Sequence, residues 1–467
     1  MTVRQTLFLI LTPIVAMCVL SFGNGFFTTF SAIELDSLGR SNFMIGIISA
    51  AYFFGMTIGS YFSQFTIMRV GYIRAFVLFA SLMAVSTLIL GIFKGVGVWI
   101  FFRFACGYAL AALFLIIESW CILSSEKKNR GLVFSLYLFV YYGTQAFSQL
   151  MINFHFSQTL LAYCFMSILC SIAIVLMAFT KTVAPAPNSE EVCSPKKIIQ
   201  KVPLAIIAGM VGGAILGSIY TIFPIFLVRI EISHNMISIF MMTTILGGML
   251  LQVPMGKLSD IIDRRKVILL AAFGIIITST CAFIFYKSYI FFSVILFLLG
   301  GCAFVIYPLA ISHASDFLEE HEILGAIGMI TIAYGIGSVI GPIIISSFMD
   351  IVGPFGFFII LGGGAALLFV YTFYRMVSRE SATDTVLFTA VTPESVGFSE
   401  AQEVVSDKLS EYTLKFNQIC EAYEVLSNLD YKLNYDKYGE KGLYQGVREG
   451  QIQHAGYSFD GNSYKIF

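Results

Sequence analysis

Long apolar runs constrain this chain more than any other feature of its sequence. Twelve of them have the roughly 20 residues needed to cross about 30 Å of hydrocarbon. Because a bilayer offers no hydrogen-bond partners to the backbone, each run is predicted to form an α-helix. The runs cover residues 7–33, 43–65, 75–93, 96–123, 131–153, 158–180, 202–228, 236–258, 266–286, 289–314, 323–349 and 352–376.

The composition supports an all-α membrane protein. Of the 467 residues, 58% are hydrophobic and 12% are charged, whereas soluble domains are about one quarter charged. The nine cysteines are scattered and form no C-x-x-C pair. They are therefore predicted to be packing residues, and no metal site or cofactor is expected.

The distribution of positive charge predicts the orientation of the helices. With a cytoplasmic N-terminus, sixteen Lys and Arg side chains fall on the cytoplasmic side of the predicted spans. Only Arg40, Lys94, Arg229 and Lys287 fall outside. Positive residues are retained on the cytoplasmic side. The sequence thus predicts a multi-pass protein of the plasma or inner membrane with both termini in the cytoplasm.

A polar segment divides the spans six and six. Residues 181–201, "KTVAPAPNSEEVCSPKKIIQK", are rich in Pro, Ser and charge, as expected of a flexible cytoplasmic linker. We therefore predict a six-helix bundle at residues 1–180 and a second at 202–376. Two such halves with a binding site between them at mid-membrane are a common transporter plan.

The segment "GKLSDIIDRRK", residues 256–266, connects two predicted helices of the second half. It resembles the G-x-L-x-D-R-x-G-R-R signature of the major facilitator superfamily, with Ile261 in place of the first arginine and Asp263 in place of the glycine. The resemblance implies two six-helix bundles with pseudo-twofold symmetry. It also implies a conformational latch, a set of contacts that form in one transport state and break in the other. The latch residues would be Arg69, Gly71 and Arg74 in the first half, and Gly256, Asp260, Asp263, Arg264 and Arg265 in the second.

Within the latch, Asp260 is expected to face the N-terminal end of a neighbouring helix, where a carboxylate is favoured. The alternative is that both segments are ordinary positively charged cytoplasmic loops.

Arg103 is a charged residue inside an apolar run. The stretch "RFACG" fits the R-x-x-x-G pattern of proton-coupled members of the superfamily, so the resemblance implies proton coupling. At 1.5 Å per residue Arg103 lies about 10 Å below the outer surface, and Asn24 and Gln145 reach a similar depth. Since an intramembrane charge that faces a bundle interior marks a substrate or ion path, the three are predicted to share one polar patch. The alternative is an arginine that snorkels to the lipid headgroups.

The second half lacks this arginine. The stretch "FLLGG", residues 297–301, is taken as its equivalent and keeps only the glycines. The asymmetry favours a functional Arg103.

Further motifs, including "ESWCILSSEKKNRG" at residues 118–131, resemble the YcaD-like branch of the superfamily, and the resemblance covers about residues 5–376. Glu118 has two open interpretations. It is either a proton-exchanging carboxylate or the structural partner of Lys127, Arg130 or Arg69.

Four tyrosines on the predicted cavity helices combine a ring face with a hydroxyl group, which suits a small polar organic solute. Each one alone is more often a packing residue. They are Tyr142, Tyr220, Tyr307 and Tyr334.

The tail has a different composition from the membrane part. Residues 377–412 are acidic and polar, and residues 413–467 resemble the second half of a DnaJ-type J-domain, with an apolar face at Phe416, Ile419, Ala422, Tyr423 and Leu426. J-domains act through an H-P-D tripeptide, which this chain lacks. A chaperone partner is therefore not expected, and the tail is predicted to be partly helical.

The sequence thus predicts a secondary active transporter of a small organic solute that works by alternating access, with proton coupling as a hypothesis. Its expected partners are the solute, H+ and the lipid bilayer, but not nucleic acid. The alternative is a membrane-anchored scaffold that uses the J-like tail. No nucleophile–His–carboxylate set, metal-ligand spacing or phosphate-binding loop is present, so an enzyme is not expected.

Overall fold

The computed structural model describes residues 3–123, 130–154, 159–178, 200–318 and 320–378. In the tail it describes 425–426, 431–433, 435–437, 439, 447–449 and 452–454. The chain divides into two compact units, Met1–Glu400 and Ala401–Phe467, and each is considered by itself.

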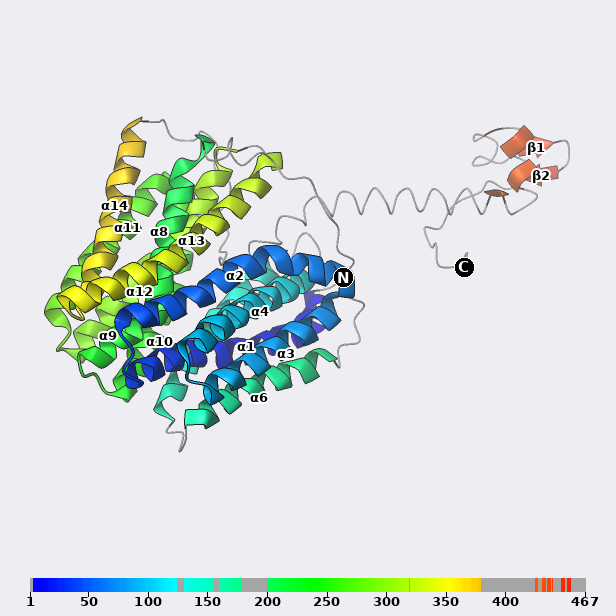
Figure 1. Ribbon diagram of the computed structural model, residues 1–467. Helices are drawn as coiled ribbons and strands as arrows, with labels where there is room; N and C mark the ends of the chain where they lie inside the picture. Colours follow the sequence, from blue (N-terminus) through cyan, green and yellow to red (C-terminus); the bar gives the residue numbers. More distant parts are fainter. Residues whose placement is uncertain are drawn as a thin grey trace. The chain divides into compact units, whose positions relative to one another are not determined.

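All twelve predicted spans are helical in the first unit (Figure 1). Among the described residues, eleven helices are long and apolar enough to cross a membrane, and α5 is the twelfth. The helices are α1 (Val3–Ser37), α2 (Asn42–Val70), α3 (Tyr72–Ile92), α4 (Val96–Leu123), α5 (Arg130–Ser148), η2 (Gln149–Asn153), α6 (Thr159–Ala178), α8 (Pro203–Thr221), α9 (Phe223–Arg229), α10 (His234–Ile261), α11 (Arg264–Phe285), α12 (Tyr289–Ser315), α13 (Glu320–Val352) and α14 (Gly356–Ser378).

Two predicted spans are interrupted rather than continuous. The span at 202–228 divides into α8 and α9 at Ile222, two residues before Pro224, whose missing N–H weakens a continuous helix. The span at 131–153 changes from α-helix to the tighter 3₁₀ form at Gln149.

Helices of each half pack closely where glycine removes a side chain. A Cβ on Gly107 of α4 would lie 1.9 Å from the Tyr52 carbonyl oxygen of α2, and a Cβ on Gly300 of α12 would lie 1.9 Å from the Thr244 carbonyl oxygen of α10. Only small residues permit helix backbones to approach this closely. The same contact occurs in both halves, which identifies α2 and α4 as the structural counterparts of α10 and α12.

This correspondence corrects the sequence alignment of the halves by one position. Gly107 corresponds to Gly300, not Gly301, so the counterpart of Arg103 is Leu296 rather than Phe297. Leu296 is completely buried. The absence of an arginine from the second half is unaffected by the correction.

The first- and second-half helices also contact each other, most extensively α2 with α13 and α5 with α10. In Figure 1 the blue and cyan helices of the first half form one group and the green and yellow helices of the second half form another. The domain boundaries predicted from the sequence remain predictions.

Polar contacts join the two halves at one end of the unit. Arg229 at the end of α9 pairs with Asp36 of α1, Nη2 to Oδ1, at 2.7 Å. The Asn42 amide donates to the Asp350 carboxylate of α13 at 2.7 Å, and the Ser238 hydroxyl donates to the Asn153 side-chain oxygen at 2.8 Å.

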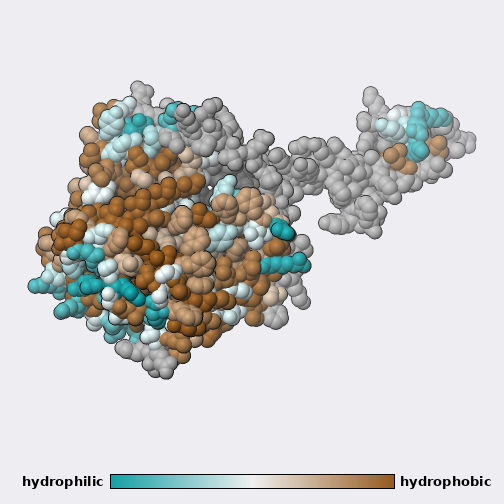
Figure 2. Space-filling model, viewed as in Figure 1, coloured by the Kyte–Doolittle hydropathy of each residue, from teal (hydrophilic) through white to brown (hydrophobic). Residues whose placement is uncertain are grey.

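The surface suits a hydrocarbon environment. The face seen in Figure 2 is covered mostly by hydrophobic side chains, with hydrophilic ones gathered toward its margins. Large apolar side chains such as Phe101, Ile290 and Leu367 are more than half exposed. In water a surface of this kind would aggregate, so these side chains are expected to contact lipid tails.

The second unit contains a short antiparallel hairpin, β1 (Val447–Glu449) with β2 (Ile452–His454), in which Arg448 pairs with Gln453. The sequence did not predict these strands. Helical backbone occurs at 431–433 and 435–437. Of the predicted apolar face, only Leu426 is described, and it is 59% exposed; Phe416, Ile419, Ala422 and Tyr423 lie outside the described residues.

Candidate functional site

The interior of the membrane unit contains a polar cavity of about 320 Å³. Its lining includes Asn24 and Thr28 of α1, Gln145 of α5 and Tyr220 of α8. Three of these four were predicted as site residues from the sequence. Both halves contribute to the lining.

A hydrogen bond from α2 holds the Asn24 side chain in place. The Tyr52 hydroxyl of α2 donates to the Asn24 side-chain oxygen at 3.2 Å, and Tyr52 also lines the cavity. The side chain of Asn24 is 5% exposed. Sequence analysis missed Tyr52, because one tyrosine in an apolar helix gives no signal of its own.

Arg103 lies behind Tyr52 rather than in the wall of the cavity. Its guanidinium carbon is 4.5 Å from the centre of the Tyr52 ring and 5.7 Å from that of Phe27. The residue is 3% exposed, so it does not snorkel to the lipid surface. Two aromatic faces stabilise the cation in this position.

One nitrogen of Arg103 has no hydrogen-bond partner. Among the described residues, nothing accepts from its Nη1 atom. A buried unsatisfied donor costs free energy, and such an atom requires an explanation. Tyr52 separates this nitrogen from the cavity.

Gln145 connects the cavity to a layer of buried polar groups. Its amide donates to the Tyr141 hydroxyl at 3.0 Å. One turn further along, the Gln149 side-chain amide donates to the Gly25 carbonyl at 3.0 Å and its oxygen accepts from the Thr29 hydroxyl at 2.8 Å. These bonds fix η2 against α1, so Gln145 is presented on a rigid surface.

A second space of about 380 Å³ adjoins the first, and the two share Phe53 and Met56. Tyr334 and Thr331 of α13 contribute to its lining. Tyr307 lies directly behind them, with its ring 5.0 Å from Tyr334 and its hydroxyl 2.9 Å from the Thr331 hydroxyl. The two spaces form one interior region between the halves.

An aromatic contact crosses between the halves beside the cavity. Phe304 of α12 packs against Tyr142 of α5 at 5.5 Å and against Tyr220 of α8 at 5.9 Å, measured between ring centres. Tyr142 is therefore placed by packing and does not line either space. Phe304 was not singled out in the sequence, where it is one of 46 phenylalanines.

A buried carboxylate on α1 was also missed. Glu34 is 6% exposed, accepts a hydrogen bond from the Tyr163 hydroxyl of α6, and pairs with the Lys94 ammonium at 2.5 Å. Tyr163 also packs on Phe27, with ring centres 5.5 Å apart, and Phe27 in turn contacts Arg103. The predicted span ended at Ile33, the residue before Glu34, whereas α1 continues to Ser37.

Glu118 lies apart from this interior region. It is completely buried in α4 but lines neither of the two spaces. Lys127 and the side chain of Arg130, two of its predicted partners, lie outside the described residues. Arg69, the third, is exposed.

The second-half latch segment forms ion pairs within its own half. Arg264 is buried, with its Nε 2.7 Å from Asp316, the residue after the end of α12, and its Nη2 3.6 Å from Asp260. Asp316 belongs to a loop that the sequence gave no reason to connect with Arg264. Gly256 is buried in α10 beside this network.

Asp263 caps α11, the helix that follows it. Its carboxylate accepts from the Arg265 backbone N–H at 3.0 Å and pairs with the Arg265 guanidinium at 2.6 Å. Burial raises the pKa of Asp263, but the hydrogen bonds and charge of Arg265, together with His313, outweigh burial and lower it. A carboxylate at a helix N-terminus satisfies free N–H groups, which explains why this position differs from the glycine of the family signature.

The first-half segment is built differently. Arg69 and Arg74 are exposed, and Gly71 makes the turn between α2 and α3 with φ +82° and ψ 164°. This backbone conformation is essentially restricted to glycine. The ion pairs described for Asp260, Asp263, Arg264 and Arg265 all lie within the second half.

Two helical halves around a polar interior space, with apolar side chains on the outside, define a multi-pass membrane transporter. The sequence profile of the Major Facilitator Superfamily matches residues 14–248 and, again, 206–409. The chain therefore belongs to the major facilitator superfamily, and it is a transporter rather than an enzyme.

Individual relatives agree with this assignment. The "Uncharacterized MFS-type transporter YcaD" of Escherichia coli O17:K52:H18 (strain UMN026 / ExPEC) is 27% identical over 305 residues, which cover 65% of this chain and 78% of the relative. The protein of the same name from Escherichia coli O7:K1 (strain IAI39 / ExPEC) is 26% identical over 304 residues, with the same coverage.

Solved structures show the same fold. The nucleoside transporter NupG aligns with a TM-score of 0.65 at 14% identity, and a point mutant of NupG aligns with a TM-score of 0.70 at 11% identity. The alignments cover 80% and 79% of this chain, respectively, and 100% of each solved chain.

Proposed function

We propose that this chain is a secondary active transporter that carries a small polar organic solute across the plasma or inner membrane by alternating access. The observation that carries the proposal is the 320 Å³ cavity, in which side-chain amides from α1 and α5 face a tyrosine from α8. Amide and phenol groups both donate and accept hydrogen bonds. They therefore suit an uncharged solute that carries several hydroxyl or amide groups.

In this conformation the polar contacts between the halves would close the outer end of the transporter. With the N-terminus in the cytoplasm, the contacts Arg229–Asp36, Asn42–Asp350 and Ser238–Asn153 lie at the outer end. Transport would then require these inter-half contacts to open while contacts at the cytoplasmic end form. This rocking of one half against the other around a fixed site is the expected mechanism for a fold with two similar halves.

Proton coupling would use the buried charges of the first half. Arg103 lies next to the cavity through Tyr52, and contacts through Phe27 and Tyr163 link it to the buried carboxylate of Glu34 near the end of α1. Intramembrane ionisable groups of this kind mark ion paths. Replacing Arg103 with alanine is expected to abolish gradient-driven uptake by proteoliposomes while the protein still reaches the membrane. Unchanged uptake would remove Arg103 from the mechanism.

The cavity is tested by ligand-induced stabilisation of the purified protein. A panel of sugars, amino acids, nucleosides and drugs is added in turn, and the thermal unfolding midpoint is measured for wild type, Asn24→Ala, Gln145→Ala and Thr280→Ala. A true ligand at about 100 times its Kd stabilises the fold by about 2.7 kcal/mol. The stabilisation should be lost in the two cavity variants.

Thr280 is the matched control, since it is exposed on α11 and its hydroxyl bonds only within its own helix. Stabilisation by a solute that persists in Asn24→Ala and in Gln145→Ala would place its binding site elsewhere and contradict the proposal.

A further inference from the structure

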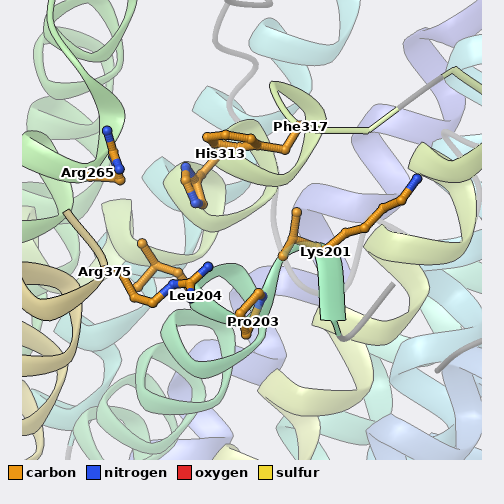
Figure 3. Close-up of a pocket in the computed structure, with 8 residues that line it drawn as sticks. Lys201, Pro203, Leu204, Arg265, His313, Phe317 and Arg375 are labelled. Carbon is orange, nitrogen blue, oxygen red and sulfur yellow. The ribbon is translucent and has the colours of Figure 1, made fainter. Parts of the chain in front are cut away.

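A second, smaller pocket lies away from the transport cavity, where the ends of four second-half helices meet. It holds about 240 Å³ and is lined by Val202, Pro203 and Leu204 at the start of α8, Arg265 of α11, His313 and Phe317 at the end of α12, Arg375 of α14, and Lys201 (Figure 3).

Half of the eight lining residues carry positively ionisable side chains. Figure 3 shows Arg265, His313 and Arg375 on one side of the pocket, while the Lys201 side chain extends away from them. Two carboxylates partly neutralise them: Glu322 pairs with Lys201 at 2.6 Å, and Asp263 pairs with Arg265 at 2.6 Å. Three fixed cations therefore face two carboxylates, and His313 adds a further positive charge when it is protonated.

Arg375 is the cation that remains available. It forms no ion pair or side-chain hydrogen bond with any other residue in the part of the chain that the structure describes, whereas the other two fixed cations are both engaged. It occupies the last turn of α14. A guanidinium offers five donors in a planar fork that matches the oxygen atoms of a phosphate or carboxylate group.

The start of α8 adds to the preference for an anion. Its N-cap residue, Val202, has no side chain able to accept a hydrogen bond from the first turn. The partial positive charge of that turn is therefore not offset by a cap. Phe317, Pro203 and Leu204 contribute apolar surface to the same lining.

We propose that this pocket binds a phosphate group, with Arg375 as the principal ligand and Lys201, Arg265 and the first turn of α8 as supporting donors. The group could be carried by a soluble phosphate or by an anionic lipid. Arg375 lies between Tyr374 and Val377, which are 61% and 75% exposed, so a lipid headgroup has access from the side of the bilayer. Binding would fasten the ends of α8, α11, α12 and α14 to one another.

The proposal is tested on the purified full-length protein with two probes. In detergent, the thermal unfolding midpoint is measured in inorganic phosphate and in sodium chloride of equal ionic strength. In nanodiscs, it is measured with phosphatidylglycerol and with phosphatidylcholine. The variants are Arg375→Gln, Arg375→Lys and, as a matched charge control, Lys257→Gln, since Lys257 is exposed at the same end but does not line the pocket.

The expected result is stabilisation of wild type and of Lys257→Gln by at least one probe, with an apparent affinity about ten-fold weaker or worse in Arg375→Gln. Arg375→Lys should recover part of the affinity. An effect of inorganic phosphate alone identifies a soluble phosphate, and an effect of phosphatidylglycerol alone identifies a headgroup. If neither probe stabilises wild type, or if Arg375→Gln responds as wild type does, the pocket is not a phosphate site.

Discussion

The two halves of the membrane unit share one scaffold but place different side chains on it. At the contact between α2 and α4, Arg103 packs on Tyr52, and Tyr52 holds Asn24. At the matching contact between α10 and α12, the corresponding positions are the buried Leu296 and Thr244. The same backbone geometry therefore supports a charged, polar environment in the first half and an apolar one in the second.

The turns between the matching helices also differ, but here the second half is the one with buried charged side chains. In the second half, Arg264 is buried against Asp316, and Asp263 caps α11. In the first half, Arg74 is exposed and Gly71 makes a turn that requires no charge. The two halves therefore share their close backbone contacts but differ in where their charged side chains are buried. The first half buries an arginine within the membrane, and the second half buries one at the end of its helices.

Arg264 provides the largest expected difference between the halves. Replacing it with alanine removes the guanidinium that faces a carboxylate only 3% exposed, and breaking a buried ion pair costs about 3–5 kcal/mol. The first-half arginine Arg74, three residues after the Gly71 turn, is exposed, so Arg74→Ala should cost within about 0.5 kcal/mol. Denaturation of both variants in detergent measures the difference. Equal losses would show that the second-half ion pair is not the stabilising contact.

Arg103→Leu makes the first half resemble the second at this position. Replacing a buried charge with an apolar residue of suitable volume is often neutral or stabilising, so the unfolding midpoint should not fall. Transport, by contrast, should decrease by about 10²-fold, because the group that positions Tyr52 is lost. Uptake by proteoliposomes and thermal unfolding are measured on the same preparation. A variant that unfolds readily but transports normally would reverse the assigned role of Arg103.

Gly107→Ala and Gly300→Ala test the contact that the halves have in common. In each case the added methyl group would lie 1.9 Å from a backbone carbonyl oxygen of the neighbouring helix. Overpacking of this kind costs about 1–3 kcal/mol, and the two losses should be similar. Gly97→Ala is the control, since no atom lies within 4 Å of its added Cβ. Only Gly107→Ala should also impair transport, because only its neighbour is Tyr52.

The fold could be predicted from the sequence because the bilayer imposes a simple rule. Every apolar run of sufficient length has to be helical, and all twelve are. Depth and helix number predicted one polar patch for Arg103, Asn24 and Gln145. The structure places Asn24 and Gln145 in the lining of one space but leaves Arg103 outside it, behind Tyr52. Tyr220, expected as an aromatic residue of a cavity helix, lines the same space. Proton coupling and the roles of the site residues remain predictions.

Other parts of the site depended on contacts that a single sequence does not contain. Tyr52 and Phe304 are aromatic residues among many, and only packing distinguishes them. Glu34 was excluded because the predicted span ended one residue before it, and helix ends are the least certain feature of sequence-based assignment. The pairing of Arg264 with Asp316 joins residues that are far apart in the chain, so no local pattern could have indicated it.

The smallest effect is expected at Gly71. With φ at +82°, an alanine here would be strained by about 1 kcal/mol or slightly more, although no atom lies within 4 Å of the added methyl group. The equivalent second-half turn, at Ile262 and Asp263, has negative φ values and therefore tolerates residues with side chains. Gly95→Ala is the control, because Gly95 lies in an interhelical loop without a positive φ.

A small loss of thermal stability confined to Gly71→Ala would show that the first-half turn depends on backbone conformation, whereas the second-half turn depends on charge. If both glycine variants lose the same stability, the cost arises from flexibility of the unfolded chain or from lipid contact, and the proposed difference between the two turns is wrong.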